Sequence, residues 1–309
     1  MLDIIIISYN GRTLTDNCIQ SILNSNFNKN TSKLGIIVVD NNSNDDTIEY
    51  ISKKYPDITI IKNEQNLGYS AAVNQGMQKS TSDYAIVTNN DVEFIDNSID
   101  ILYHFISNNK NIGLAIPQQF YPNNVWQKSY GDFSGIKCGL KYLFGITLFE
   151  NVFNRKFYKP SNSSKKKNKI IDYADGAVLM LSKKTFNDVG GFDQDYFFYA
   201  EDMDYSYKLK LNNYDRYIIP KAIVYHHRGG SSRENKFSKE KQEALVNAKL
   251  LFCKKHLSST STHLYIKLEQ LHHLSMLFLF SFINKLKGTE HTKIKQDYYK
   301  LMYLIWKTK

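Results

Sequence analysis

The chain has 309 residues, of which 42% are hydrophobic, and it carries a formal net charge of +10. A chain of this length and composition can bury a sizeable core, which excludes a disordered tail and a small disulfide-stapled module. The basic excess lies at the C-terminus, because residues 235–309 contain 14 Lys and 5 acidic residues, a net charge of +9. The first three quarters of the chain are therefore close to neutral.

Three cysteines, Cys18, Cys138 and Cys253, are spread too widely along the chain for a metal-binding pair or a disulfide framework. We therefore expect a reduced, cytoplasmic protein. Asp3 interrupts the N-terminal apolar run, so we expect no secretory signal peptide. The longest apolar stretch, residues 274–283, is about half of the ~20 residues that a membrane-spanning helix needs, so we expect no segment to cross a bilayer.

Buried strands and helices alternate in the N-terminal part of the chain. Runs rich in β-branched residues predict strands over residues 2–8, 34–40, 58–61 and 83–91, and apolar residues at helical spacing predict a helix between each pair. Continuous apolar runs are typical of strands that are buried on both faces of a parallel sheet. The order therefore predicts βαβ crossovers and a parallel sheet.

Polar residues follow these strands where each one ends. Ligands of open α/β sheets bind beyond the carboxyl ends of the strands, so we expect these residues to line one crevice. The chain has neither a GxGxxG sequence after the first strand nor a P-loop sequence, which excludes the usual dinucleotide and P-loop sites. The residues are Asn10, Asp40, Asn41, Asn89, Asn90 and Asp91.

Residues 154–169 contain seven basic and no acidic residues within a Ser/Asn-rich stretch, which is typical of a mobile surface loop. Binding of an anion by this loop is the alternative. An amphipathic helix is expected from Glu201, and residues 216–226 are expected to form a last short strand before a loop rich in His and Gly.

Several of these side chains point to chemistry on a phosphorylated donor. Asp40 and Asp91 suit a hard divalent cation, although strand-end carboxylates also cap loops. Acidic residues over 201–204 are either catalytic or an ordinary helix N-terminus. His226 and Arg228 are suited to binding a metal and a phosphate.

Six segments occur together in an order and spacing that resembles glycosyltransferase family 2, over roughly residues 2–232. They are IIIISYN, IIVVDNNSNDDT, NEQNLGYSAAVNQGM, YAIVTNNDVEF, DGAVLMLSKKTFNDVGGFDQDYFFYAEDMDYSYKLK and YIIPKAIVYHHRGGSS. The resemblance is closest to the rhamnosyltransferase-like branch that builds bacterial surface polysaccharides.

The resemblance implies an α/β protein of the GT-A (Rossmann-like) type, with a mixed, mainly parallel sheet flanked by helices and a C-terminal helical extension. The implied catalytic domain covers residues 1–234, with a nucleotide-binding half over 1–117 and an acceptor half over 118–234. The basic helical extension covers residues 235–309.

The resemblance also implies roles for single residues. Asp40 would hydrogen-bond the nucleobase, Gly176 and Ala177 would lie near the donor sugar, and Asp202 would be the general base. Glu201, Asp193 and Asp204 would support the base or contact the acceptor. The implied nucleotide-sugar site consists of Asn10, Asp40, Asn66, Asn89, Asn90, Asp91, Gly176, Ala177, Arg228 and Arg233.

The implied cofactor is a divalent metal, Mn²⁺ or Mg²⁺, held by Asp91 and His226. The family writes its metal motif as Asp-x-Asp or Asn-x-Asp, whereas this chain has Asn89-Asn90-Asp91, so the first carboxylate is missing. Asp175 occupies a position at which the family more often has a small neutral residue.

The activity implied is inverting transfer of rhamnose or another hexose from a nucleoside-diphosphate donor, dTDP-rhamnose or a UDP-sugar. The acceptor would be a hydroxyl of a growing lipid-linked surface polysaccharide or an oligosaccharide. An inactive sugar-nucleotide-binding or scaffold protein of the same fold is the alternative, which the missing carboxylate favours and Asp202 disfavours.

The C-terminal extension combines basic charge with apolar residues at helical spacing. Such a pattern suits a helix on an anionic membrane, so we expect peripheral association with the inner face of the cytoplasmic membrane. A helical cap or a homodimer interface is the alternative. Nucleic acid is not an expected partner, because the extension has 14 Lys and no Arg and matches no named motif. The apolar residues are Leu264, Leu268, Leu271, Phe278 and Phe282.

Overall fold

The computed structural model describes residues 1–27, 34–227 and 238–309. The chain forms two compact units, an α/β unit and a helical unit. The α/β unit consists of residues 1–131, 154–197 and 201–233, and the helical unit consists of residues 132–153, 198–200 and 234–309. The predicted functional division at residues 117 and 234 stays a prediction.

The α/β unit contains the strands of the main sheet and a small two-stranded sheet. Its strands are β1 (Leu2–Ser8), β2 (Leu34–Asp40), β3 (Thr59–Lys62), β4 (Tyr84–Asn89), β5 (Val92–Phe94), β6 (Ile112–Phe120), β7 (Tyr130–Gly131), β8 (Lys169–Ile170), β9 (Tyr173–Ala174), β10 (Val178–Ser182) and β11 (Asp215–His226). Its helices are α1 (Arg12–Leu23), α3 (Thr47–Lys54), α4 (Tyr69–Lys79), α5 (Ser98–Ser107), α8 (Pro160–Ser163), α9 (Lys183–Asp188) and α10 (Glu201–Leu211).

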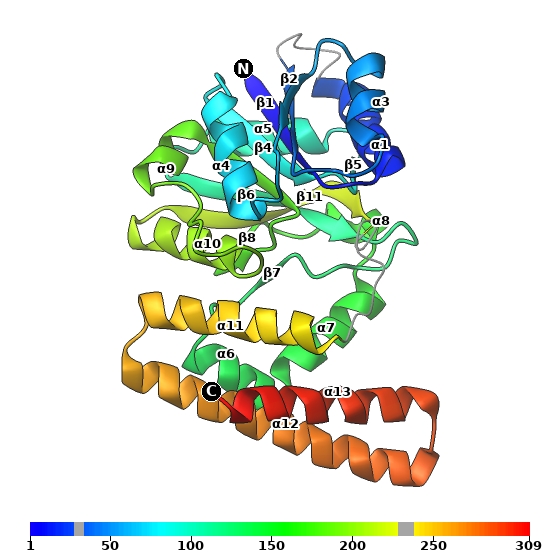
Figure 1. The fold of residues 1–309 in the computed structure, drawn as a ribbon, viewed down its shortest axis with the longest axis vertical. Coiled ribbons are helices and arrows are strands. Elements are labelled where there is room, and N and C mark those ends of the chain that lie inside the picture. The colour runs from blue at the N-terminus through cyan, green and yellow to red at the C-terminus, as the bar shows by residue number, and fades with distance from the viewer. Residues whose placement is uncertain (28–33, 228–237) are drawn as a thin grey trace. The chain divides into compact units, whose positions relative to one another are not determined.

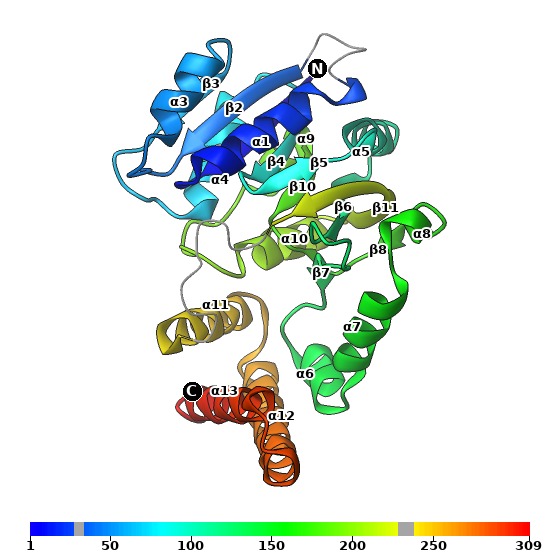
Figure 2. The same ribbon diagram turned by 90° about the vertical axis from the view of Figure 1, so that its right-hand side faces the viewer.

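The main sheet runs in the order β3-β2-β1-β4-β10-β6-β11-β5, and β8 pairs with β11 (Figure 2). Strands β1 to β4 are parallel to one another, as predicted, whereas β10 is antiparallel to both β4 and β6. The predicted mixed, mainly parallel sheet is therefore confirmed. The chain passes to β2 on one side of β1 and to β4 on the other, so a crevice is expected beyond the carboxyl ends of β1 and β4.

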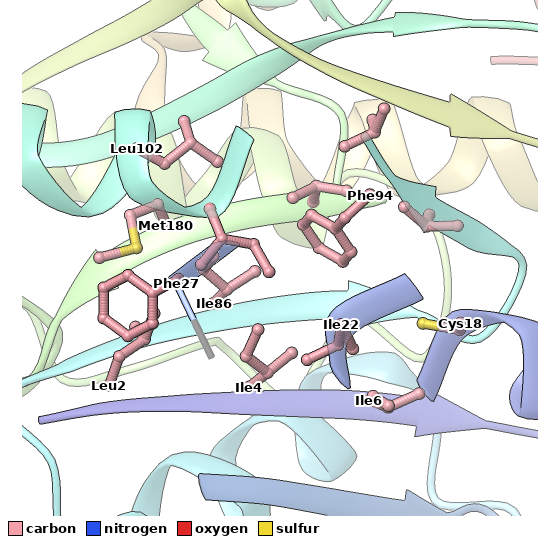
Figure 3. Packing of buried hydrophobic residues seen from close by; sticks show 14 of the residues in the cluster. Leu2, Ile4, Ile6, Cys18, Ile22, Phe27, Ile86, Phe94, Leu102 and Met180 are labelled. Atoms are coloured by element: carbon pink, nitrogen blue, oxygen red, sulfur yellow. The ribbon is translucent and has the colours of Figure 1, made fainter. Parts of the chain in front are cut away.

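Strand β1 explains why its sequence is apolar without interruption, since all seven of its residues are buried. Leu2, Ile4 and Ile6 pack on one face of the sheet with residues of α1 and α5 (Figure 3). Ile5 and Ile7 pack on the other face with residues of α4 and α10. Two core layers on opposite faces hold the strand ends in fixed positions.

One prediction about the second half of this unit is wrong. Residues 154–169 are not a loop throughout, because they include the end of α7 (Ile146–Phe157) and all of α8. Ser163 anchors this segment, since its buried hydroxyl donates to the Pro220 carbonyl at 2.5 Å. The strand predicted over residues 216–226 is confirmed as β11, and a register shift between Ile219 and Ile223 lets it continue past Pro220.

The helical unit contains α6 (Ile136–Leu143), most of α7, α11 (Lys239–His256), α12 (Ser259–Lys287) and α13 (Glu290–Lys307). Helices α12 and α13 form an antiparallel pair (Figure 1), joined by side-chain bonds from Thr292 to Asn284 and from Gln270 to the Trp306 carbonyl. The predicted C-terminal helical extension is confirmed. Among the residues that the structure describes, no helix combines the length and apolar character needed to cross a membrane.

Candidate functional site

The residues at the ends of β1 and β2 are joined by hydrogen bonds. Asp40 is fully buried, and its carboxylate accepts from the Ser43 hydroxyl at 2.5 Å. The same hydroxyl accepts from the Asn10 main-chain N–H at 2.8 Å, and the Asn10 side-chain oxygen accepts from the Asn44 N–H at 2.8 Å. Asn10 has a left-handed backbone with φ 57°, which Asn tolerates better than most residues. The two predicted pocket residues therefore lie at one edge of the sheet.

Asn66 is held by Asn41, a residue to which the family resemblance assigns no role. The Asn41 amide nitrogen donates to the Asn66 side-chain oxygen at 2.8 Å, and the Asn41 oxygen accepts from the Leu67 N–H at 3.0 Å. Asn63 donates to the same Asn41 oxygen at 3.2 Å and exchanges two bonds with Gln75. The only signal for this amide network in the sequence is Asn41, a polar residue directly after a buried strand.

The Asn89-Asn90-Asp91 segment connects this edge to β10. The Asn89 N–H donates to the Ala177 carbonyl at 3.0 Å. Asn90 is buried and points back toward β1, because its amide nitrogen donates to the Asn10 carbonyl at 2.9 Å and to the Thr15 hydroxyl at 3.0 Å. Asn90 thus anchors the segment to the residues that follow β1, whereas the Asp91 side chain faces His226.

Asp91 faces His226, which ends β11. The distance from Asp91 Oδ1 to His226 Nε2 is 3.3 Å, and both residues are buried. His226 Nδ1 lies 2.7 Å from Gln127 Oε1 and 3.1 Å from Gln119 Oε1. The Gln127 amide nitrogen donates to the His226 carbonyl, which fixes the orientation of that amide. Nδ1 therefore carries a proton, and Nε2 is directed at Asp91.

When Nε2 is protonated it donates to Asp91 Oδ1, and when it is not, its lone pair and the carboxylate are two acceptors, which suits a metal cation. Burial raises the pKa of Asp91, but the hydrogen bond and charge of His226 outweigh burial and hold that pKa below its usual value. A carboxylate and an imidazole whose other nitrogen is hydrogen-bonded fit Mn²⁺ or Mg²⁺, with phosphate oxygens and water as the remaining ligands. The residues described contain no group of three His, Cys, Asp or Glu that could hold a metal alone.

Asp202 begins α10 and contacts the Gly176-Ala177 step. Its carboxylate accepts from the Gly176 N–H at 3.0 Å and from the Met203 N–H at 2.7 Å. Burial, and then the charge of Asp175, raise the pKa of Asp202 to about 7, although these two hydrogen bonds lower it. Burial and the neighbouring Asp202 charge raise the pKa of Glu201 well above its usual value. A carboxyl group that is half ionised near neutral pH is suited to general base catalysis.

Tyr69 and Asp175 hold the Gly176-Ala177 step, and neither was assigned a role from the sequence. The Tyr69 hydroxyl donates to the Gly176 carbonyl at 2.5 Å, and Asp175 Oδ1 accepts from the Ala177 N–H at 3.2 Å. A Cβ atom on Gly176 would lie 3.3 Å from the Tyr69 hydroxyl, so the close approach favours Gly there. Asp175 thus both orients the step and raises the Asp202 pKa.

The remaining predicted residues lie at the border of this site or outside the description. Asp204 is buried and accepts from the Tyr196 hydroxyl at 3.3 Å, and Asp193 accepts from the Asp195 N–H at 2.9 Å. Both stabilise the segment that leads into α10. Arg228 and Arg233 lie outside the described residues.

Two open clefts, of about 350 and 400 Å³, lie in other parts of the α/β unit. Asn74, Phe186 and Gly191 are among the residues that line the first, and Asn109 and Tyr217 are among those that line the second. Neither cleft includes a residue of the polar network described above. We therefore define the site by that network and by the perturbed carboxylates within it.

The family described as Glycosyl transferase family 2 matches residues 3–186, which is more than half of the chain. The chain belongs to this family. As a glycosyltransferase of family 2, it transfers a sugar from a nucleotide-sugar donor. The family and the rhamnosyltransferase-like character predicted from the sequence are confirmed.

One relative is the N-acetylglucosaminyl-diphospho-decaprenol L-rhamnosyltransferase of Mycobacterium tuberculosis. It is 26% identical over 215 residues, which cover 64% of this glycosyltransferase and 68% of the relative. The low-salt glycan biosynthesis hexosyltransferase Agl10 of Haloferax volcanii is 25% identical over 182 residues, which cover 57% of this chain. The matched region spans about half of Agl10, 53% of its length.

Two solved structures share the fold at low sequence identity. The mannosyltransferase PcManGT from Pyrobaculum calidifontis, in complex with GDP-Man and Mn²⁺, has a TM-score of 0.64 at 12% identity, with 99% of this chain and 86% of that chain covered. GalNAc-T7 with UDP, GalNAc and Mn²⁺ has a TM-score of 0.56 at 16% identity, with 82% and 50% covered. Both neighbours confirm the GT-A-like fold.

Replacing Asp175 by Asn is expected to lower the pKa of Asp202, because the Asp175 charge disfavours ionisation of its neighbour. Below about pH 7 most Asp202 side chains are protonated and cannot accept a proton, so kcat/KM should fall as the pH is lowered. The variant should shift this acidic limb to lower pH, as measured by a pH–rate profile. Asp195→Asn, in the segment before α10, is the matched control. An unchanged limb in Asp175→Asn would contradict the electrostatic role.

Proposed function

We propose that this glycosyltransferase transfers rhamnose or another hexose, with inversion, to a hydroxyl of a lipid-linked or oligosaccharide acceptor. The observation that carries the proposal is Asp202, a partly buried residue whose carboxyl pKa is raised to about 7 and which contacts the Gly176-Ala177 step. A hydrogen bond connects this step to Asn89, two residues before Asp91. The Mycobacterium tuberculosis relative is named an L-rhamnosyltransferase, which supports a rhamnosyl donor, for which dTDP-rhamnose is the first candidate and a UDP-sugar the second.

In the proposed reaction, Asp202 accepts the proton of the acceptor hydroxyl as that oxygen attacks the anomeric carbon. The bond between the anomeric carbon and the diphosphate oxygen breaks, and its electron pair leaves with the nucleoside diphosphate. Attack from the face opposite the leaving group inverts the anomeric centre. A single base suffices, because no covalent sugar intermediate has to form.

Asp91 and His226 are proposed to hold a divalent cation beside the leaving diphosphate. When bound, such a cation neutralises the negative charge that develops on the diphosphate oxygens. Gln127 and Gln119 hold the His226 ring so that Nε2 stays available as a ligand. The reported structures of PcManGT and GalNAc-T7 both contain Mn²⁺, which supports this assignment.

A catalytically inactive sugar-nucleotide-binding protein remains the alternative, because the first carboxylate of the metal motif is replaced by Asn89. The presence of Asp202, a candidate general base, supports an active enzyme instead. Burying a carboxyl group next to Asp175 costs stability, and perturbed groups of this kind are concentrated at functional sites.

Asp202→Asn should abolish most turnover while donor binding changes little, because the amide keeps the size of the side chain but cannot accept the proton. A loss of ~10² to 10⁴ in kcat is expected for removal of a general base. Turnover with a panel of sugar nucleotides and donor affinity by calorimetry would separate the two effects. Asp195→Asn should behave as wild type. Near wild-type turnover in Asp202→Asn would move the base to another residue.

Excess EDTA should abolish turnover, and Mn²⁺ or Mg²⁺ should restore it. Gln127→Leu removes the nearer of the two acceptors for His226 Nδ1–H, so we expect up to ~10- to 100-fold weaker Mn²⁺ binding, measured by Mn²⁺ EPR with nucleoside diphosphate present. Gln127→Glu keeps an acceptor and is the matched control. Full turnover in EDTA, together with unchanged Mn²⁺ affinity in Gln127→Leu, would reject the metal site.

The C-terminal helices are proposed to hold the enzyme at the inner surface of the cytoplasmic membrane as a peripheral protein. Leu271, Phe278 and Phe282 of α12 are exposed, whereas Leu268 lies against Gly139 of α6. The net charge of +9 over residues 235–309 supports contact with anionic lipid. Phe278→Ser with Phe282→Ser should therefore weaken binding to vesicles that contain phosphatidylglycerol. If this variant binds vesicles as the wild type does, and light scattering shows that it has lost a dimer that the wild type forms, α12 is a subunit interface instead.

A further inference from the structure

Helix α7 has its apolar side turned outward. Thr147 is the only residue of α7 described as buried. Phe149 is 71% exposed and Val152 is 58% exposed, and Ile146, Phe153 and Phe157 are also exposed. At 3.6 residues per turn these five apolar side chains and that of Leu148, which is 57% exposed, fall within an arc of roughly 180°. A helix of a water-soluble protein normally turns such a stripe toward the core, so α7 has the opposite arrangement.

Phe144 extends the apolar surface. It lies in the turn between α6 and α7, and it is 72% exposed. Contiguous exposed apolar surface of this kind marks an interaction site in a soluble protein.

Basic charge directly follows the apolar stripe along the chain. Arg155 and Lys156 lie on α7 itself and are exposed. Residues 159–169 add exposed Lys159, Lys165, Lys166, Lys167 and Lys169, and residues 154–169 contain no acidic residue. A helix with exposed aromatic and aliphatic side chains and adjacent Lys and Arg fits the boundary between lipid headgroups and acyl chains.

We propose that α7 inserts its exposed face into an anionic lipid leaflet, with Phe149 and Val152 at its centre. The charge decides between a membrane and a second copy of this chain. A dimer through α7 would bring together two segments, residues 154–169 of each copy, that each carry seven basic and no acidic residues, and their net charges repel. An anionic leaflet instead attracts them, at about 1 kcal/mol per Lys or Arg near the surface. Residues 146–157 lie outside the C-terminal extension, so this surface goes beyond the function proposed above.

The test uses the full chain and co-sedimentation with vesicles of phosphatidylcholine, with and without phosphatidylglycerol. Phe149→Ser with Val152→Ser should weaken binding about tenfold or more at both low and high salt, because it removes apolar burial. Lys165→Gln, Lys166→Gln and Lys167→Gln together should weaken it only at low salt and only with phosphatidylglycerol. Leu211→Ser is the matched control, since Leu211 is an exposed leucine at the end of α10.

A second measurement reports insertion directly. Trp introduced as Phe149→Trp should be quenched by brominated lipid, whereas the native Trp126 and Trp306 are buried and should not be. Absence of quenching, or vesicle binding that Phe149→Ser with Val152→Ser leaves unchanged, would overturn the proposal. Loss of binding only in the α12 variants would assign the membrane contact to the C-terminal helices. The proposal would also be overturned if the wild-type chain bound neither kind of vesicle. The same holds if the wild type formed a dimer that the α7 substitutions dissociate.

Discussion

The pairing of β4 with β10 is the interaction on which the site depends. It is antiparallel within an otherwise largely parallel region, and it places the Asn89 N–H against the Ala177 carbonyl. Because Gly176 then contacts Asp202, one short chain of hydrogen bonds joins the end of β4 to the proposed base. The same main-chain geometry thus holds the Asn89-Asn90-Asp91 segment and Asp202 in one network.

Two aspartates in this site have opposite pKa shifts, and their neighbours explain the difference. Burial alone raises the pKa of both. Asp91 faces His226, whose hydrogen bond and charge lower its pKa below the usual value. Asp202 instead lies near Asp175, and the second negative charge adds to the effect of burial. One fold therefore keeps one carboxylate ionised and holds the pKa of another near neutral pH, as the two proposed roles require.

The helical unit shows the same dependence on surroundings. Leu268 and Leu271 belong to one apolar pattern on α12, yet Leu268 lies against Gly139 while Leu271 is exposed. On α7 the apolar stripe is exposed and the buried residue is Thr147. Exposed apolar side chains are the common feature of α7 and α12, and a lipid surface is a chemically suitable environment for both.

The sequence by itself determined the parallel sheet, the family and the residues at the strand ends, because uninterrupted β-branched runs and fixed motif spacing are local signals. It also identified Asp202, Asp91 and His226 as functional candidates. Only the tertiary structure shows the contacts around them. Tyr69 donates a hydrogen bond to the Gly176 carbonyl, Gln127 accepts one from His226, and the charge of Asp175 acts on Asp202. These contacts join residues far apart in the chain, so no local pattern encodes them. The exposed side of α7 was likewise invisible in the sequence, because periodicity shows that a helix has an apolar face but not whether anything covers it.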